Sequence, residues 1–135
     1  MTTEEREAFW EKLYSEPGFG IWMGNFRDIF VSRAANATIS DFVARKIRER
    51  VKDPKIADKL IPKDHGFGTR RVPLETNYYE VYNQPNVSLV DLRETPIERV
   101  TPTGIQTTDA ARDFDMIIYA TGFDAVLGGF NRLDI

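Results

Sequence analysis

The sequence DFDMIIYATG, residues 113–122, decides the fold class, because it contains the most hydrophobic run in the chain, Met116 to Ala120. An unbroken apolar run of this length predicts a strand buried on both faces, as in the parallel sheet of an α/β domain. In α/β proteins, nucleotides bind at the carboxyl ends of such strands. Ala120, Thr121 and Gly122 are therefore candidate ligand-contacting residues, although a plain turn at the end of a strand explains them equally well.

Short strands are also expected upstream of this run. NVSLVDL, residues 86–92, alternates between apolar and polar side chains and predicts a strand. PIERVTPTGIQTT predicts a hairpin with strands over 97–101 and 105–108, joined by a turn at 102–104. The second half of the chain is thus expected to be short strands without the helices that would cover a buried strand.

The pattern before Pro62 is helical. Thr2 and Glu5 have the spacing of a capping box, which predicts the beginning of a first helix. SEPGFG, residues 15–20, ends that helix, and apolar side chains at three-to-four spacing predict a second one over 22–33.

A third helix is expected in SDFVARKIRERVKD, with Ser40 as its cap. Its apolar face is formed by three aliphatic residues: Val43, Ile47 and Val51. Its basic residues lie mostly off that face and are expected to be a solvated surface: Arg45, Lys46, Arg48 and Arg50. Asp53 and Pro54 predict a further short helix towards Leu60, because proline suits the first helical position.

Composition excludes several classes of function. The chain has 135 residues and a net charge of -3, so it carries no general basic field for nucleic acid or an anionic membrane. It has no cysteine, which excludes disulfides, thiolate metal sites and cysteine nucleophiles. No apolar run approaches the roughly 18 residues of a membrane helix, and the first residues are charged. A cytoplasmic location is the default expectation.

Two motifs that suggest ligand sites are expected to be structural. GFGIWMG, residues 18–24, resembles a dinucleotide fingerprint, but a helix precedes it where the fingerprint requires a strand. His65 is the only histidine, so no multi-histidine metal site is possible, and no carboxylate cluster has metal-ligand spacing. Metal binding is not expected.

The arginine pair in HGFGTRRVPLETNYYEVYN is more informative. Arg70 and Arg71 are permanently charged forks that fit phosphates and other oxyanions, and Gly66 and Gly68 permit close backbone approach. Hydration, or pairing with Asp64 and Glu75, explains the pair at least as well from spacing alone. The tyrosine-rich segment that follows, residues 76–83, predicts a short helix.

Together, DHGFGTRRVPLETNYYEVYNQPNVSLVDLRETPIERVTPTGIQTTDA and DFDMIIYATGFDA resemble the flavin-dependent Baeyer–Villiger monooxygenases, most closely the cyclohexanone monooxygenase branch. The family fold has two dinucleotide-binding domains, one for FAD and one for NADP. The resemblance implies that this α/β chain is an internal fragment. Residues 1–62 would be a helical insertion, 63–122 the C-terminal part of the NADP-binding domain, and 123–135 the start of the return to the FAD domain.

The resemblance also implies roles for individual residues. Arg71 matches the family's catalytic arginine, which stands over the flavin ring and stabilises negative charge on oxygen during the reaction with a ketone. Arg70 falls where these enzymes usually have a lysine associated with the 2′-phosphate of NADPH. Ala120, Thr121 and Gly122 match the family's ATG motif and would pack near the cofactors. The implied substrates are a small ketone and dioxygen, and the product is an ester or lactone.

The sequence departs from the family pattern and leaves two alternatives open. It contains no GxGxxG after a strand, whereas the family uses one for FAD and another for NADP. A related flavin monooxygenase that oxidises nitrogen or sulfur is one alternative. A non-catalytic module that binds a protein partner is the other. Neither the particular ketone nor the oligomeric state follows from the sequence.

Overall fold

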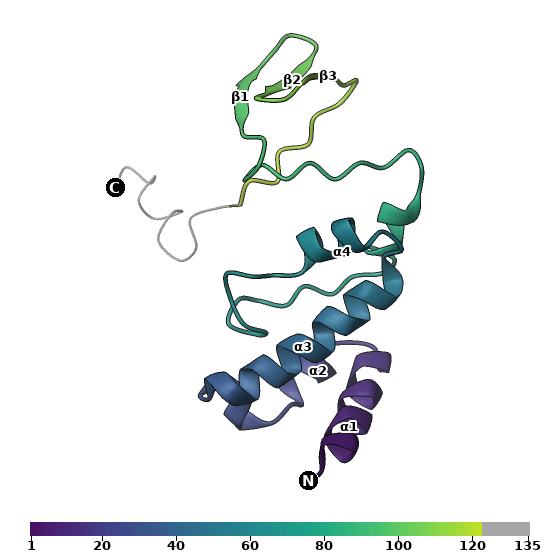
Figure 1. Ribbon diagram of the computed structural model, residues 1–135, viewed down its shortest axis with the longest axis vertical. Coiled ribbons are helices and arrows are strands. Elements are labelled where there is room, and N and C mark those ends of the chain that lie inside the picture. The colour runs from purple at the N-terminus through teal and green to yellow at the C-terminus, as the bar shows by residue number, and fades with distance from the viewer. Residues whose placement is uncertain (123–135) are drawn as a thin grey trace, which may run out of the picture. The chain divides into compact units, whose positions relative to one another are not determined.

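The computed structural model of the protein describes residues 1–122, which form two compact units (Figure 1). The first unit is Met1–Leu89, and the second begins at Val90. The expected return to an FAD domain over 123–135 lies outside the described residues, and the assignment of 1–62 and 63–122 to parts of an NADP-binding domain stays a prediction.

The first helix, α1 (Thr3–Ser15), confirms the predicted capping box. The backbone N–H of Thr2 donates to Glu5 Oε2 at 2.8 Å, and the backbone N–H of Glu5 donates to Thr2 Oγ1 at 3.2 Å. These two bonds satisfy amide groups that a helix beginning leaves without partners. The helix buries Trp10 and ends at Ser15, where the sequence predicts its end.

The continuous second helix predicted over 22–33 is wrong. The structure has a single α-helical turn, α2 (Gly20–Met23), and a separate 3₁₀ turn, η1 (Arg27–Phe30). Asn25 causes the break, because its side chain takes the place of helical bonding. Its Oδ1 accepts from the backbone N–H of Phe26 at 2.8 Å, and its Nδ2 donates to the carbonyl of Ile21 at 3.0 Å.

The long helix α3 (Arg33–Arg50) begins earlier than predicted. Its cap is Ser32, whose hydroxyl accepts from the backbone N–H of Ala35 at 3.3 Å, so the prediction of Ser40 as the cap is wrong. Alanine-rich sequence after Ser32 favours helix and extends it through Ser40.

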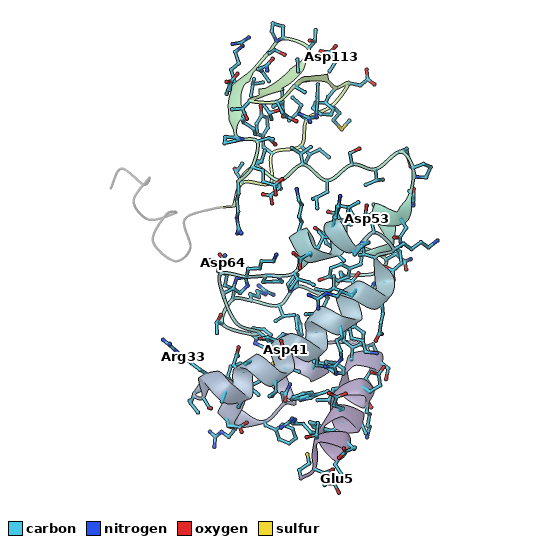
Figure 2. All side chains as sticks on the ribbon, viewed as in Figure 1. Glu5, Arg33, Asp41, Asp53, Asp64 and Asp113 are labelled. Carbon is cyan, nitrogen blue, oxygen red and sulfur yellow. The ribbon has the colours of Figure 1, made fainter. Side chains whose placement is uncertain are left out.

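The short helix α4 (Pro54–Leu60) is confirmed where Asp53 and Pro54 predict its beginning (Figure 2). Asp53 accepts from the backbone N–H of Lys55 at 2.8 Å, and Pro54 occupies the first turn, where its missing N–H costs nothing.

Helix α3 supplies side chains to both hydrophobic clusters of the first unit. One cluster contains Trp10, Ile29, Ile39 and Phe42, which join α3 to α1 and η1. The other contains Ile47, Val51 and Ala57, which join α3 to α4, and Val43 packs against both clusters. The predicted apolar face of Val43, Ile47 and Val51 is thus confirmed, and α3 is the element around which the unit is built.

The chain after α4 is mostly irregular. A 3₁₀ turn, η2 (Glu80–Asn83), stands within the region predicted as a short helix. The strand predicted over 86–92 is wrong, because these residues make no strand pairing. Local turns lie at the two ends of this segment instead. The backbone N–H of Val87 donates to the carbonyl of Gln84 at 3.2 Å, and the backbone N–H of Glu94 donates to the carbonyl of Asp91 at 3.0 Å.

The second unit contains an antiparallel sheet in the order β1-β2-β3. Strands β1 (Ile97–Val100) and β2 (Gly104–Thr107) form the predicted hairpin, and β3 (Ala111–Asp113) adds a strand that the sequence does not announce. Gly104 lies so close to β3 that a Cβ on it would stand 1.9 Å from the carbonyl oxygen of Arg112. Only glycine permits this pairing.

The strand predicted for Met116 to Ala120 is also wrong. The segment forms no strand, and its large apolar side chains are exposed: Met116 by 76%, Ile118 by 80% and Tyr119 by 67%. A strand exists only where a neighbouring strand bonds to it, and residues 1–122 supply no such neighbour to this run. Within the described part of the chain, the large apolar side chains of this run therefore stay exposed.

A small polar cluster closes the turn between β2 and β3. Arg112 donates from Nη2 to Asp109 Oδ2 at 2.9 Å and from Nη1 to the hydroxyl of Thr107 at 2.6 Å. Thr107 is 3% exposed and also bonds Asp109, at 2.6 Å. These hydrogen bonds to Arg112 and Thr107 lower the pKa of Asp109 to about 2, from an ordinary value of 3.8.

We expect this turn to weaken only in strong acid. Because the folded state lowers the pKa of Asp109, the stabilisation is complete above the unfolded pKa of 3.8 and is lost as the pH falls through about 2. A side-chain NMR titration should therefore place the carboxyl midpoint of Asp109 near 2. In Arg112→Gln the midpoint should move up. A midpoint of 3.8 in the unmodified protein would show that the cluster does not form.

Candidate functional site

The loop that carries the two arginines is fixed to α3 by Asn36 and Ser40. The Asn36 side chain donates to the carbonyls of Phe67 and Ile29, each at 2.8 Å. The Ser40 hydroxyl accepts from the backbone N–H of Phe67 at 3.0 Å and donates to Asn36 Oδ1 at 3.2 Å. Both polar groups of the Phe67 backbone are thereby bonded to one helix, which sets the position of the loop.

The two glycines of the loop serve this same contact. A Cβ on Gly66 would stand 1.9 Å from Asn36 Oδ1, so no other residue fits over the Asn36 amide. Gly68 has a positive φ, +73°, and a Cβ there would meet Phe30 at 3.0 Å and Trp22 at 3.1 Å. The close approach expected from these glycines is thus made by the protein's own side chains.

Arg70 is paired, as the alternative interpretation of the sequence allows. Its Nη2 lies 3.2 Å from Asp64 Oδ2, and Figure 2 labels Asp64 in the loop after α4. The other carboxylate oxygen lies 2.7 Å from His65 Nδ1. The His65 contact, with a smaller contribution from Arg70, lowers the pKa of Asp64. The Arg70 side chain is still 67% exposed, so an incoming anion can reach it.

Arg71 differs from its neighbour. It is exposed, and it makes no ion pair or hydrogen bond with another residue of the described range 1–122. Glu75, the partner that the sequence suggests for it, is bonded to Arg50 at 2.6 Å. The guanidinium of Arg71 therefore has its full bonding capacity available.

Both arginines line a cavity of about 160 Å³ beside α3. The walls are mainly apolar and come from α3, from the residues after α4 and from Tyr79. The polar groups that face it include His65, Arg70, Arg71 and Ser40. A cation beside an apolar wall attracts an anion more strongly than one surrounded by water, because the local dielectric constant is lower.

Arg50 connects the segment after Arg71 to α3, which corrects the expectation that it is a solvated surface residue. It donates to Glu80 at 2.6 and 2.8 Å, to Glu75 at 2.6 and 3.2 Å, and to the hydroxyl of Tyr14 at 3.0 Å. Its guanidinium also lies 4.9 Å from the centre of the Tyr79 ring. These bonds lower the pKa of both glutamates and raise that of Arg50.

The other basic residues of α3 are closer to the expectation. Arg45 and Arg48 are about half exposed and lie in ion pairs with Glu7 and Asp58. Lys46 is less exposed, at 16%, and bonds Glu11 at 2.7 Å. The sequence pattern of the helix does not distinguish Arg50 from these residues, because its carboxylate partners, Glu75 and Glu80, lie far along the chain.

The remaining candidate residues lie in the second unit. Ala120, Thr121 and Gly122 are exposed, and Gly122 has a φ of +86°. Their role as cofactor contacts stays a prediction. GFGIWMG is confirmed as a connection between helices: Gly18 has a φ of +92°, and α2 begins at Gly20.

Metal-binding clusters and membrane-spanning helices are absent from the described part of the chain. Residues 1–122 contain no group of three or more histidine, cysteine or acidic side chains placed to hold a metal ion. They also contain no helix with the length and apolar character needed to cross a bilayer.

The chain is similar to several known monooxygenases. It is 62% identical over 135 residues to 2-oxo-Δ3-4,5,5-trimethylcyclopentenylacetyl-CoA monooxygenase of Pseudomonas putida, covering 100% of this chain and 25% of that protein. It is 43% identical over 134 residues to a Baeyer–Villiger monooxygenase of Pseudooceanicola batsensis, covering 98% and 24%. It is 42% identical over 137 residues to phenazine N-monooxygenase PhzNO1 of Lysobacter antibioticus, covering 100% and 25%. No protein-family model matches the chain.

The fold matches solved structures over the same extent. The crystal structure of OTEMO in complex with FAD and NADP superimposes with a TM-score of 0.97 and 61% identity, covering 99% of this chain and 25% of that one. The helical segment and small antiparallel sheet described above are thus part of a flavin monooxygenase fold. Over the region that it spans, the chain is thus homologous to Baeyer–Villiger monooxygenases. It spans about a quarter of the length of the curated relatives that it matches.

We expect Asn36→Asp to release the loop from α3. The substitution keeps the size of the side chain but removes the donor, so the carbonyls of Ile29 and Phe67 lose their partner at a cost of about 1–3 kcal/mol. Hydrogen exchange of residues 64–70 should accelerate, while exchange in α4 should not change. The control is Asn86→Asp, at an exposed position. Equal exchange in the two variants would contradict the assigned role.

Proposed function

We propose that the chain supplies the anion-binding arginines of an FAD- and NADPH-dependent monooxygenase that inserts one atom of dioxygen beside a ketone carbonyl, giving an ester or lactone. The observation that carries the proposal is the state of Arg71. It is a cation without a partner in residues 1–122, directly after a loop that is bonded to α3 and beside a mainly apolar cavity. Such a cation can stabilise negative charge that develops on oxygen once bound cofactor and substrate exclude water from it.

The described residues fit the cofactors in part. A bound flavin would supply oxygen activation, and NADPH would supply the reducing hydride. Arg71 is available to an anion at the flavin, and Arg70 is exposed enough to meet a phosphate. Gly66 and Gly68 cannot cradle a pyrophosphate, since Asn36, Phe30 and Trp22 occupy the space beside them. Arg70 and Arg71 would therefore interact with negative charge on the bound cofactors.

Arg70 is proposed to contact the 2′-phosphate of NADPH. Its bond to Asp64 is a single contact of 3.2 Å on an exposed side chain. A phosphate dianion offers more charge and three acceptor oxygens, so it can replace the carboxylate at the guanidinium. Ala120, Thr121 and Gly122 are proposed to pack near the cofactors through their small side chains and backbone. FAD, NADPH and a small ketone are thus proposed ligands of the whole enzyme.

Oxidation of nitrogen is the second candidate activity, and one observation favours it: a relative of 42% identity carries the name phenazine N-monooxygenase. The residues described here act on the oxidant and the coenzyme, and they do not select between a carbonyl carbon and a ring nitrogen. Incubation of the whole enzyme with a cyclic ketone and, separately, with a phenazine decides between the two. Lactone formation alone supports the proposal, whereas N-oxide formation alone contradicts it.

We expect Arg71→Ala to separate two activities in the whole enzyme. Ester formation should fall by at least about 100-fold, as for removal of a donor that meets a developing oxyanion. Flavin reduction by NADPH should remain measurable, because that step needs no charge at Arg71. Both are followed by product chromatography and by flavin absorbance. The control is Arg27→Ala, at another exposed arginine. Normal ester formation by Arg71→Ala would refute the assignment.

For Arg70→Ala we expect a selective loss of affinity for NADPH. Loss of a hydrogen bond between charged groups costs about 1.5–3 kcal/mol, which corresponds to a rise in KM of roughly 10-fold or more. The KM for NADH should change little, since NADH lacks the 2′-phosphate. The control is Lys63→Ala, a nearby cation that is bonded to Asp58. Equal rises for NADPH and NADH would count against the proposed contact.

A further inference from the structure

The position of Arg71 depends on backbone contacts of the residues around it. An arginine that makes no bond within the described residues can place its guanidinium at many points around its Cα. Its reach is then limited by how firmly the backbone at residue 71 is held. The last fixed point before it is the turn in which the backbone N–H and the hydroxyl of Thr69 donate to the carbonyl of Gly66, at 3.3 and 2.8 Å.

The first fixed point after Arg71 is Glu75. Its carboxylate accepts from Arg50 at 2.6 and 3.2 Å and from the backbone N–H of Tyr78 at 2.8 Å. Between Thr69 and Glu75 the chain includes Pro73, whose ring fixes one backbone angle. The segment that can move is thus limited to residues 70–74.

The loop before Arg71 and the segment after it are both bonded to the same rigid element, α3. Asn36 and Ser40 hold the loop before Arg71, and Arg50 holds the segment after it, and all three residues lie on α3. A helix changes its length very little, so it keeps the two ends of the arginine segment at a constant separation. If the Glu75 bond is removed, the next fixed point is Tyr79, and the mobile segment extends over residues 70–78.

We propose that Glu75, through its ion pair with Arg50, is a positioning residue that holds Arg71 at the place where it acts in the oxygen-transfer step. This inference rests on the proposed function of Arg71. Glu75 itself touches neither substrate nor cofactor in the proposal. Its effect is to shorten the segment that carries the guanidinium, and displacement of a catalytic group by about 1 Å lowers a rate by roughly 100-fold.

Glu80 provides a matched control. It bonds the same guanidinium of Arg50, at 2.6 and 2.8 Å, but it lies in η2, beyond Tyr79. Removing either carboxylate leaves Arg50 with one bidentate partner. Only Glu75 lies next to residues 70–74, the segment that carries the arginines. A general effect on folding should therefore appear in both Glu75→Ala and Glu80→Ala, whereas a positioning effect should appear in Glu75→Ala alone.

The test compares Glu75→Ala, Glu75→Gln and Glu80→Ala in the whole enzyme with its cofactors bound. The readouts are ester formed per NADPH consumed, the rate of flavin reduction and the thermal unfolding midpoint. Glu75→Ala should lower the ester yield per NADPH by about 10-fold or more, while flavin reduction stays within about twofold. Glu75→Gln, which retains a hydrogen-bond acceptor, should be intermediate, and Glu80→Ala should match the unmodified enzyme in ester yield and in flavin reduction.

Two results would overturn the inference: equal ester yields in Glu75→Ala and Glu80→Ala, or a parallel fall of ester yield, flavin reduction and unfolding midpoint in Glu75→Ala. The first would remove the link to position, and the second would show a purely structural role. Arg71→Ala, measured alongside, separates this inference from the proposed function. If Arg71→Ala forms ester normally, the proposed function fails; if it does not and Glu75→Ala does, only the positioning role of Glu75 fails.

Discussion

The first unit depends on one guanidinium that two carboxylates share. Arg50 stands at the last position of α3 and bonds Glu75, Glu80 and the hydroxyl of Tyr14, so it connects three separate parts of the chain. Its backbone carbonyl also accepts from Asn83 at 2.7 Å. Because the residues after α4 have little regular structure of their own, such side-chain bonds take the place of a sheet or helix pairing in holding them.

Local chemistry made the helices of this chain predictable where a single cap or proline determines the boundary. Thr2 with Glu5, and Asp53 with Pro54, specify where α1 and α4 begin, and the structure agrees. The prediction failed where a side chain competes with helical bonding, as Asn25 does after α2. The strand predicted from Met116 failed because an apolar run identifies a need for burial and says nothing about where the partner lies.

The residues of the candidate site likewise fall into those that the sequence predicts and those that it does not. Arg70, Arg71 and the positive φ of Gly68 follow from residue type and from resemblance to a known family. Asn36 and Arg50 do not, since each bonds residues some thirty positions along the chain. A polar residue within a helix is usually solvated, and only the folded loop distinguishes Asn36 from its neighbours.

The contact of Gly68 with Trp22 gives the protein an intrinsic optical reporter. The indole edge of Trp22 lies 3.1 Å from the place that a Cβ of Gly68 would occupy, so its emission responds to the presence of the arginine loop. Trp10, the other tryptophan of the chain, is 1% exposed and bonds Asn25. Fluorescence can therefore follow docking of this loop in real time without any added label.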